Sequence, residues 1–110
     1  MTADPAEPVT LVFVGHASAA TADRAAAYED AVLPLLADHG ARLVYRGRRR
    51  DIQDAAQPFE VHVLWFPRRA AFDAYLADDR RRALIDEFGE VFTAKEVVEM
   101  ETIASEPLPR

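Results

Sequence analysis

One stretch, residues 59–67, constrains the fold more than any other part of the chain. It reads Phe-Glu-Val-His-Val-Leu-Trp-Phe-Pro. Its odd positions are all apolar, and its even positions combine Glu60 and His62 with two apolar residues, Leu64 and Phe66, so both faces of a strand here would contain apolar side chains. A strand that is apolar on both faces lies inside a sheet and is covered on both sides. Pro67 cannot donate a hydrogen bond within a sheet and is favoured in the first turn of a helix. The stretch therefore predicts a central strand that leads into a helix over residues 68–77.

The N-terminal part of the chain predicts a strand followed by a helix. Residues 9–14 are apolar almost throughout and rich in β-branched side chains, as in a strand buried on both faces, and Gly15 ends them. Apolar residues then recur at helical spacing as far as Gly40, which is a favoured helix end. Pro34 lies inside this pattern, where it removes a backbone donor, so the helix is predicted to kink there.

The remaining elements follow from the same periodicities. Residues 41–47 predict a second strand, with Leu43 and Tyr45 on one face and Arg42, Val44 and Arg46 on the other. A hairpin loop over residues 48–58 joins it to the central strand. After that strand, two short apolar stripes separated by Asp78 and Asp79 predict a broken helix. Residues 96–103 predict the last strand, with Val98 and Met100 pointing inward.

This order, β-α-β-β-α-β, predicts an α+β fold of the ferredoxin-like type, a four-stranded antiparallel sheet with helices on one face. The whole chain, 1–110, is expected to form one domain with a core over 9–103 and loose tails at 1–8 and 104–110. Because helices cover one face only, while the inner strands are apolar on both, a second copy of the chain is expected to cover the other face as a homodimer.

Composition excludes several classes of partner. The chain has 13 Lys and Arg against 19 Asp and Glu, a formal net charge of -6, so nucleic-acid binding is not expected. There is no cysteine, no apolar run long enough to cross a membrane, and no basic N-terminal leader, which predicts a cytoplasmic protein without membrane partners. The basic residues 46–50 form either a cationic mouth for a ligand acid group or a solvated loop balanced by Asp51 and Asp54.

Three stretches together resemble a known family. They are Tyr-Glu-Asp-Ala-Val-Leu-Pro-Leu-Leu at 28–36, His-Gly-Ala-Arg-Leu-Val-Tyr-Arg-Gly at 39–47, and Val-Leu-Trp-Phe-Pro-Arg-Arg-Ala-Ala-Phe at 63–72. The chain resembles the domain of unknown function 1330 family, within the dimeric α/β barrel superfamily. The resemblance implies two sheets paired face to face and ligands held between sheet and helices. Many of these relatives carry a glutamate where this chain has Trp65. Any acid or base role of that glutamate therefore cannot be assigned to this chain.

Two histidines are candidate catalytic residues. His62 lies in the central strand with Glu60 two residues away on the same face, an arrangement suited to proton transfer. His16 follows Gly15 at a strand end, where functional groups are often placed. The alternatives are a hydrogen-bonded core or interface histidine for His62 and an exposed loop imidazole for His16. His39 is interpreted as a partner of a helix C-terminus.

Aromatic and basic residues are candidate ligand-binding groups. An aromatic pocket between helices and sheet would be lined by Tyr28, Tyr45, Trp65, Phe72 and Tyr75, although such residues also fill ordinary cores. Arg46 lies on a strand and is positioned to bind an acid group of a ligand, or else to pair with an acidic helix residue or a partner subunit. No metal-binding pair, phosphate loop or catalytic triad is recognisable, so neither a metal nor a cofactor is expected.

The sequence thus predicts a dimeric protein that binds a small molecule. It is either a cofactor-independent enzyme, using proton transfer or oxygen chemistry on an aromatic or carboxylate-bearing metabolite, or a non-catalytic ligand-binding or dimerisation module. An open cleft reaching Tyr45, Arg46 and Trp65 would favour the enzyme, and tight packing there the module.

Overall fold

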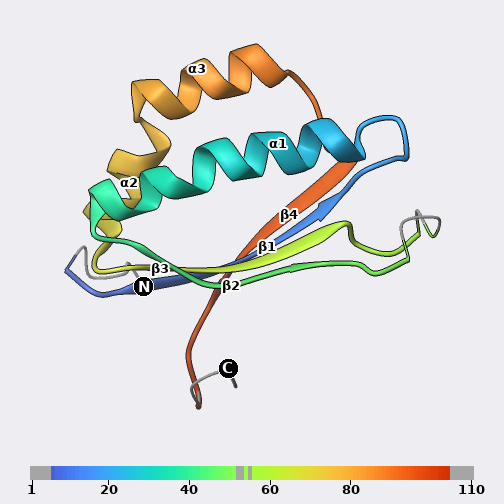
Figure 1. The fold of residues 1–110 in the computed structure, drawn as a ribbon. Helices are drawn as coiled ribbons and strands as arrows, with labels where there is room; N and C mark the ends of the chain where they lie inside the picture. Colours follow the sequence, from blue (N-terminus) through green and yellow to red (C-terminus); the bar gives the residue numbers. More distant parts are fainter. Residues whose placement is uncertain (1–5, 52–53, 55, 105–110) are drawn as a thin grey trace.

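The computed structural model describes residues 6–51, 54 and 56–104, and the predicted tails lie largely outside these ranges. The elements in order are β1 (Val9–His16), α1 (Ala22–Val32), the 3-10 helix η1 (Leu33–His39), β2 (Arg42–Arg48), β3 (Glu60–Phe66), α2 (Arg69–Leu76), α3 (Asp79–Phe88) and β4 (Ala94–Met100). The four strands form one antiparallel sheet in the order β2-β3-β1-β4. All helices lie on the same side of it (Figure 1). The chain therefore has the predicted α+β ferredoxin-like fold.

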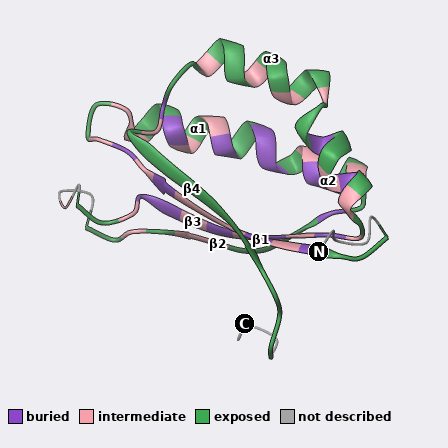
Figure 2. Cartoon of the chain, turned by 180° about the vertical axis from the view of Figure 1, so that it is seen from behind, coloured by how far each residue is buried: buried purple, intermediate pink, exposed green. Residues whose placement is uncertain are grey.

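Strand β3 is central, as predicted, because it pairs with β2 on one side and β1 on the other. Its residues alternate between two environments. Glu60, His62, Leu64 and Phe66 are buried toward the helices, whereas Val61, Val63 and Trp65 are half-buried on the opposite side. We call that opposite side the bare face, because no helix lies on it. In Figure 2 the inner strands β1 and β3 consist of buried and intermediate residues, while β4 is exposed along its whole length.

The main core lies between the sheet and α1, η1 and α2. It is built around Phe66, which has no exposed surface, and its other buried members are Val9, Leu11, Val32, Leu33, Leu36, Ala41, Leu64, Ala71 and Tyr75. A smaller cluster of Ala17, Ala25, Phe59 and Val91 closes the other end of the sheet. Among the described residues, no helix has the length and apolar character that crossing a membrane requires.

Both helical breaks fall where the sequence predicts them. At Pro34 the chain passes from α1 into η1, because proline supplies no N–H for the α-helical ladder. Gly40 ends η1 with a φ of 68°, a conformation that favours glycine. The second helix is interrupted at Asp78, whose carboxylate accepts a 2.9 Å hydrogen bond from the backbone N–H of Arg80 and begins α3.

Two strands differ from their predicted bounds. β1 continues through Gly15 to His16, because Gly15 pairs with Glu60 on β3 and with Lys95 on β4. Glycine suits this position because a Cβ there would lie 2.8 Å from the Phe13 ring. β4 spans residues 94–100, and its predicted inward pair was wrong. Val98 and Met100 pair with β1 positions on the bare face and are 45% and 48% exposed.

Strand β2 contains an irregularity that the sequence did not predict. Leu43 pairs with Leu64 and Tyr45 pairs with Val63, so Val44 is an extra residue between two consecutive partners, a β-bulge. Leu43 and Tyr45 therefore lie on opposite faces, which corrects the predicted alternation. Beyond the bulge, Arg46 pairs with His62 and so faces the helices.

Candidate functional site

A cleft opens between β2 and the helices above it. Its volume is about 400 Å³, and it is lined by Glu29, Asp30, Leu33, Pro34, Leu36, Ala37, Ala41, Leu43 and Arg46. Most of these side chains are apolar, and the three polar ones come from adjacent positions on α1 and from β2. The cleft is thus suited to a small molecule with an apolar body and a polar group at one end.

Behind the polar end lies a set of six residues that we call the Glu60 network: Glu29, Asp30, Arg46, Arg48, Glu60 and His62. Three of them are almost fully buried, with exposures of 4% for Glu29, 1% for Glu60 and 2% for His62. Helix periodicity turns Glu29 toward the sheet together with Ala25 and Val32. Buried charged groups at this density require mutual hydrogen bonds to be stable.

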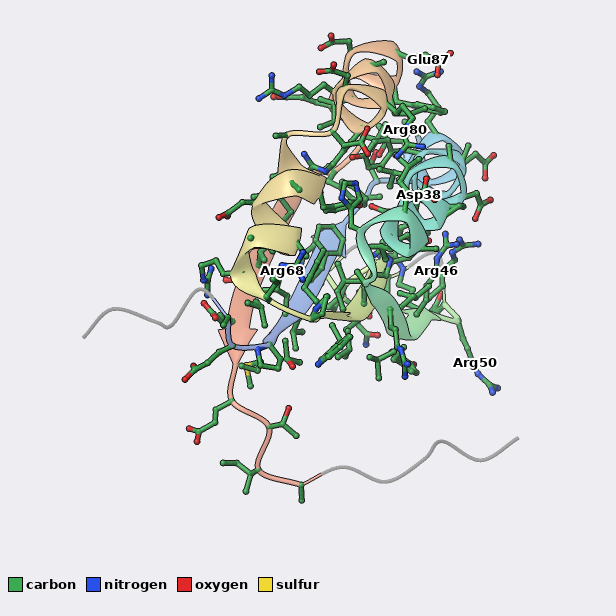
Figure 3. All side chains as sticks on the ribbon, turned by 90° about the vertical axis from the view of Figure 1, so that its left-hand side faces the viewer. Asp38, Arg46, Arg50, Arg68, Arg80 and Glu87 are labelled. Atoms are coloured by element: carbon green, nitrogen blue, oxygen red, sulfur yellow. The ribbon has the colours of Figure 1, made fainter. Side chains whose placement is uncertain are left out.

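Glu60 is the centre of these hydrogen bonds. Arg46 donates from Nε and Nη2 to its two oxygens at 2.8 and 3.0 Å, and Arg48 donates from Nε and Nη2 to Oε2 at 3.0 and 2.6 Å. Both arginines reach Glu60 because the bulge at Val44 turns them to its side of the sheet. Arg46 also donates to Asp30 on α1, at 2.8 Å, and lies between β2 and the helix layer (Figure 3).

The charge of Glu60 fixes the orientation of His62. Burial by itself raises the pKa of Glu60, but hydrogen bonds from His62, Arg46 and Arg48 lower it to about 2, so this residue is a carboxylate. A carboxylate only accepts, and it lies 2.7 Å from His62 Nε2, so Nε2 carries a proton and donates it. The Phe13 ring stacks on the imidazole with centroids 4.9 Å apart. The other nitrogen, Nδ1, is thereby directed to Glu29.

Glu29 and His62 form an acid–base pair. Burial raises the pKa of Glu29 to about 7, despite the opposing attraction of His62. Glu29 Oε2 lies 3.8 Å from His62 Nδ1, close enough for strong electrostatic coupling although longer than a hydrogen bond. Near neutral pH the Glu29 carboxyl group can therefore both release and accept a proton. Glu29 lines the cleft, so it can exchange that proton with a bound molecule.

The structure separates the two predicted catalytic histidines. His62 is in the Glu60 network, whereas His16, paired with Ala94, lies on the bare face. His39 ends η1 as predicted, and its Nε2 is 2.8 Å from the Asp78 carboxylate. For Arg46, the salt bridge to an acidic helix residue that the sequence left open is present, with Asp30 as the partner.

The predicted aromatic set does not line one pocket. Tyr45 and Trp65 lie on the bare face, where Arg42 covers the Trp65 ring at 5.7 Å. Phe72 and Tyr75 pack against Phe66 in the main core. Tyr28 contacts the smaller cluster through Phe88 and Phe92. The predicted pocket is therefore corrected to a cleft with aliphatic walls, which reaches Arg46 but is not lined by Tyr45 or Trp65.

Sequence reasoning missed Glu29, Asp30 and the role of Arg48. The available signal for Glu29 was its place in the series 25, 29, 32 and 36, in which every other residue is apolar and buried. A lone carboxylate in such a series indicates a buried acid. Within the described ranges, no group of three or more His, Asp or Glu side chains is arranged to hold a metal ion.

No family model and no curated protein matches the chain. Solved structures match its fold. A candidate antibiotic biosynthesis monooxygenase from Bacteroides thetaiotaomicron has a TM-score of 0.74 at 7% identity and covers 97% of this chain and 100% of its own. A dimeric ferredoxin-like protein of unknown function from Jannaschia has a TM-score of 0.64 at 19% identity, covering 86% and 98%.

A third similar structure is a hydroxynitrile lyase from Passiflora edulis, with a TM-score of 0.61 at 15% identity, covering 96% of this chain and 100% of the lyase. At these identities the likeness concerns the fold alone. The matched proteins have different activities or none assigned, so chemistry must be inferred from this chain's own side chains.

Proposed function

We propose that this protein binds a small molecule in the cleft and catalyses proton transfer on it, with Glu29 as the general acid–base and without a bound cofactor. The observation that carries the proposal is a buried carboxyl group with a pKa of about 7 on the wall of a cleft, next to an oriented imidazole. General acids and bases work best when their pKa lies near the working pH. Enzymes among the structures that share the fold support small-molecule chemistry in such an architecture.

The reaction follows from the ionisation of Glu29. As a carboxylate, Glu29 removes a proton from a ligand carbon next to a carbonyl group. The electron pair of the C–H bond moves to the carbonyl oxygen, where an Arg46 N–H stabilises the negative charge. Glu29 then returns the proton to the same or a neighbouring carbon, which gives exchange or isomerisation without any oxidant.

The proposal is tested by hydrogen–deuterium exchange of the methyl protons of acetophenone in D₂O, followed by ¹H NMR. We expect the protein to accelerate exchange, with a rate that rises with pH through about 7 as Glu29 ionises. Glu29→Gln should lower the rate about a hundredfold, because glutamine cannot accept the proton. Glu87→Gln, on the exposed surface of α3, is the control. Equal rates for the two variants would show that Glu29 is not the base.

The alternative function, a non-catalytic binding or dimerisation module, is favoured by a different feature. The bare face carries apolar side chains from all four strands: Val12 and Val14 on β1, Val61, Val63 and Trp65 on β3, Tyr45 on β2, and Val98 and Met100 on β4. Three of these, Tyr45, Val98 and Met100, are nearly half exposed in the single chain. Exposed apolar side chains grouped on one face mark an interaction site. We also propose that the chain belongs to the domain of unknown function 1330 family, because of the three stretches at 28–36, 39–47 and 63–72 that resemble it.

We propose that a second copy of the chain covers the bare face; a protein of the same fold is described as dimeric. Light scattering at micromolar concentration should give about twice the chain mass of 12.3 kDa. Val98→Arg places a charge on the bare face and should shift the mass toward the monomer. Ile85→Arg, at a similarly exposed site on α3, should leave the dimer intact. A wild-type monomer at high concentration would refute this arrangement.

A further inference from the structure

Asp30 occupies the position on Arg46 that an acidic ligand would need. Its Oδ1 accepts from Arg46 Nη1 at 2.8 Å, and both residues line the cleft. Glu60 binds the guanidinium at Nε and Nη2. The Asp30 side chain is 66% exposed, so it reaches the guanidinium from the solvent side, while Glu60 holds it from the protein interior.

Carboxylates within the Glu60 network balance the charges of its two arginines. Arg46 and Arg48 contribute two positive charges, and Glu60 and Asp30 contribute two negative ones. Glu29 adds a further negative charge when it is ionised. The cleft therefore offers no surplus positive charge, and an anion placed in it would lie beside the carboxylate of Asp30. Like charges in direct contact repel, which disfavours an anion at this position.

We infer that the cleft selects uncharged ligands and that Asp30 is the residue that determines this selectivity by holding Arg46. The inference rests on the proposed function, since it concerns the same cleft, and it replaces the expectation that Arg46 anchors a ligand acid group. The chemical class is a small, largely apolar molecule with a neutral hydrogen-bond acceptor such as a carbonyl oxygen.

The geometry also leaves a place for that acceptor. A guanidinium has five N–H groups, and three of those on Arg46 donate to Glu60 and Asp30 in the described part of the chain. A neutral carbonyl oxygen can accept from one of the others without displacing Asp30. A carboxylate must either break the Asp30 contact or lie against it. The remaining walls, from Leu33 to Leu43, are apolar and suit an uncharged body.

Benzamide and benzoate test the inference because they share size and shape and differ in charge. Dissociation constants for both are measured by ¹H–¹⁵N NMR titration of the full chain at pH 7.5, following backbone signals of the residues that line the cleft. We expect wild type to prefer benzamide over benzoate by about tenfold or more. Asp30→Asn frees the charge of Arg46 and should reduce that preference by about tenfold through tighter benzoate binding.

Asp23→Asn is the matched control, because it removes the same charge from the exposed first turn of α1, outside the cleft lining, and should leave the preference unchanged. Wild type that binds benzoate as tightly as benzamide would overturn the inference, as would an Asp30→Asn variant with an unaltered preference. Failure of benzamide to perturb the cleft signals at saturating concentration would also overturn it. These results concern binding, so they stand apart from proton exchange, whose failure in the Glu29 experiment would refute the catalytic proposal alone.

Discussion

Replacing Glu60 with alanine is expected to lower the free energy of unfolding by about 3–5 kcal/mol, the range for removing one partner of a buried ion pair. The substitution leaves Arg46 and Arg48 without their shared acceptor and removes the carboxylate that holds His62 Nε2. Every buried side-chain nitrogen and oxygen in the described ranges has a hydrogen-bond partner, so the loss creates several unsatisfied groups at once.

Urea unfolding of wild type and variant at pH 7, at a fixed protein concentration, measures this effect. The control is Glu99→Ala, which also removes a strand glutamate paired with an arginine, Arg69, but at an exposed site. That change should cost at most about 1 kcal/mol. Because the pKa of Glu60 is lowered from 4.5 to about 2, its contribution is complete above pH 4.5 and is lost as the pH falls toward 2. Equal costs for the two variants would contradict the central role of Glu60.

Replacing Glu29 with glutamine should have the opposite effect and stabilise the protein by about 3 kcal/mol above pH 7. The pKa of Glu29 is raised from 4.5 to about 7, so the folded state binds its proton more tightly than the unfolded state. The folded protein therefore loses stability as the pH rises from about 4.5 to 7, and the shift of about 2.5 units corresponds to about 3 kcal/mol. Glutamine keeps the shape and removes the charge.

Unfolding curves at pH 5, 6, 7 and 8 check this prediction. The difference between variant and wild type should be small at pH 5 and grow to its full size at pH 8. Glu87→Gln controls for the general loss of a negative charge and should show no such growth. A difference that stays constant with pH would mean that Glu29 is already ionised in the folded state at pH 5. Greater stability with less activity is the usual sign of a strained catalytic group.

Most of the architecture was predictable because local rules decide it. The alternation in residues 59–66, the glycine at Gly40 and the Asp78 cap each act over a few residues, and the structure confirms each of them. The faces of β2 were predicted wrongly, since a bulge is decided by pairing with another strand. The face on which Val98 lies was predicted wrongly for a related reason. Its pairing with β1 sets which residues of β4 point to each face.

The candidate site was predictable in part. Glu60 and His62 share strand parity, so their contact follows from the sequence alone, and the same parity separates His62 from Trp65. Glu29 was hidden because charged residues on a helix usually face solvent. Its burial depends on His62, Glu60 and Arg46 meeting beneath α1, a long-range arrangement that no local pattern describes.

The bulge in β2 has a consequence for how homologous sequences can differ in length. Val44 is surplus to the pairing, because its neighbours Leu43 and Tyr45 pair with consecutive residues of β3. Natural sequences that keep the site can therefore lose one residue at this position, and the strand becomes regular with both arginines still beneath α1. A deletion at Gly47 would instead turn Arg48 to the bare face and away from Glu60. In an alignment of relatives that retain these side chains, single-residue gaps should occur at position 44 and in the loop at 49–59, but not at 46–48.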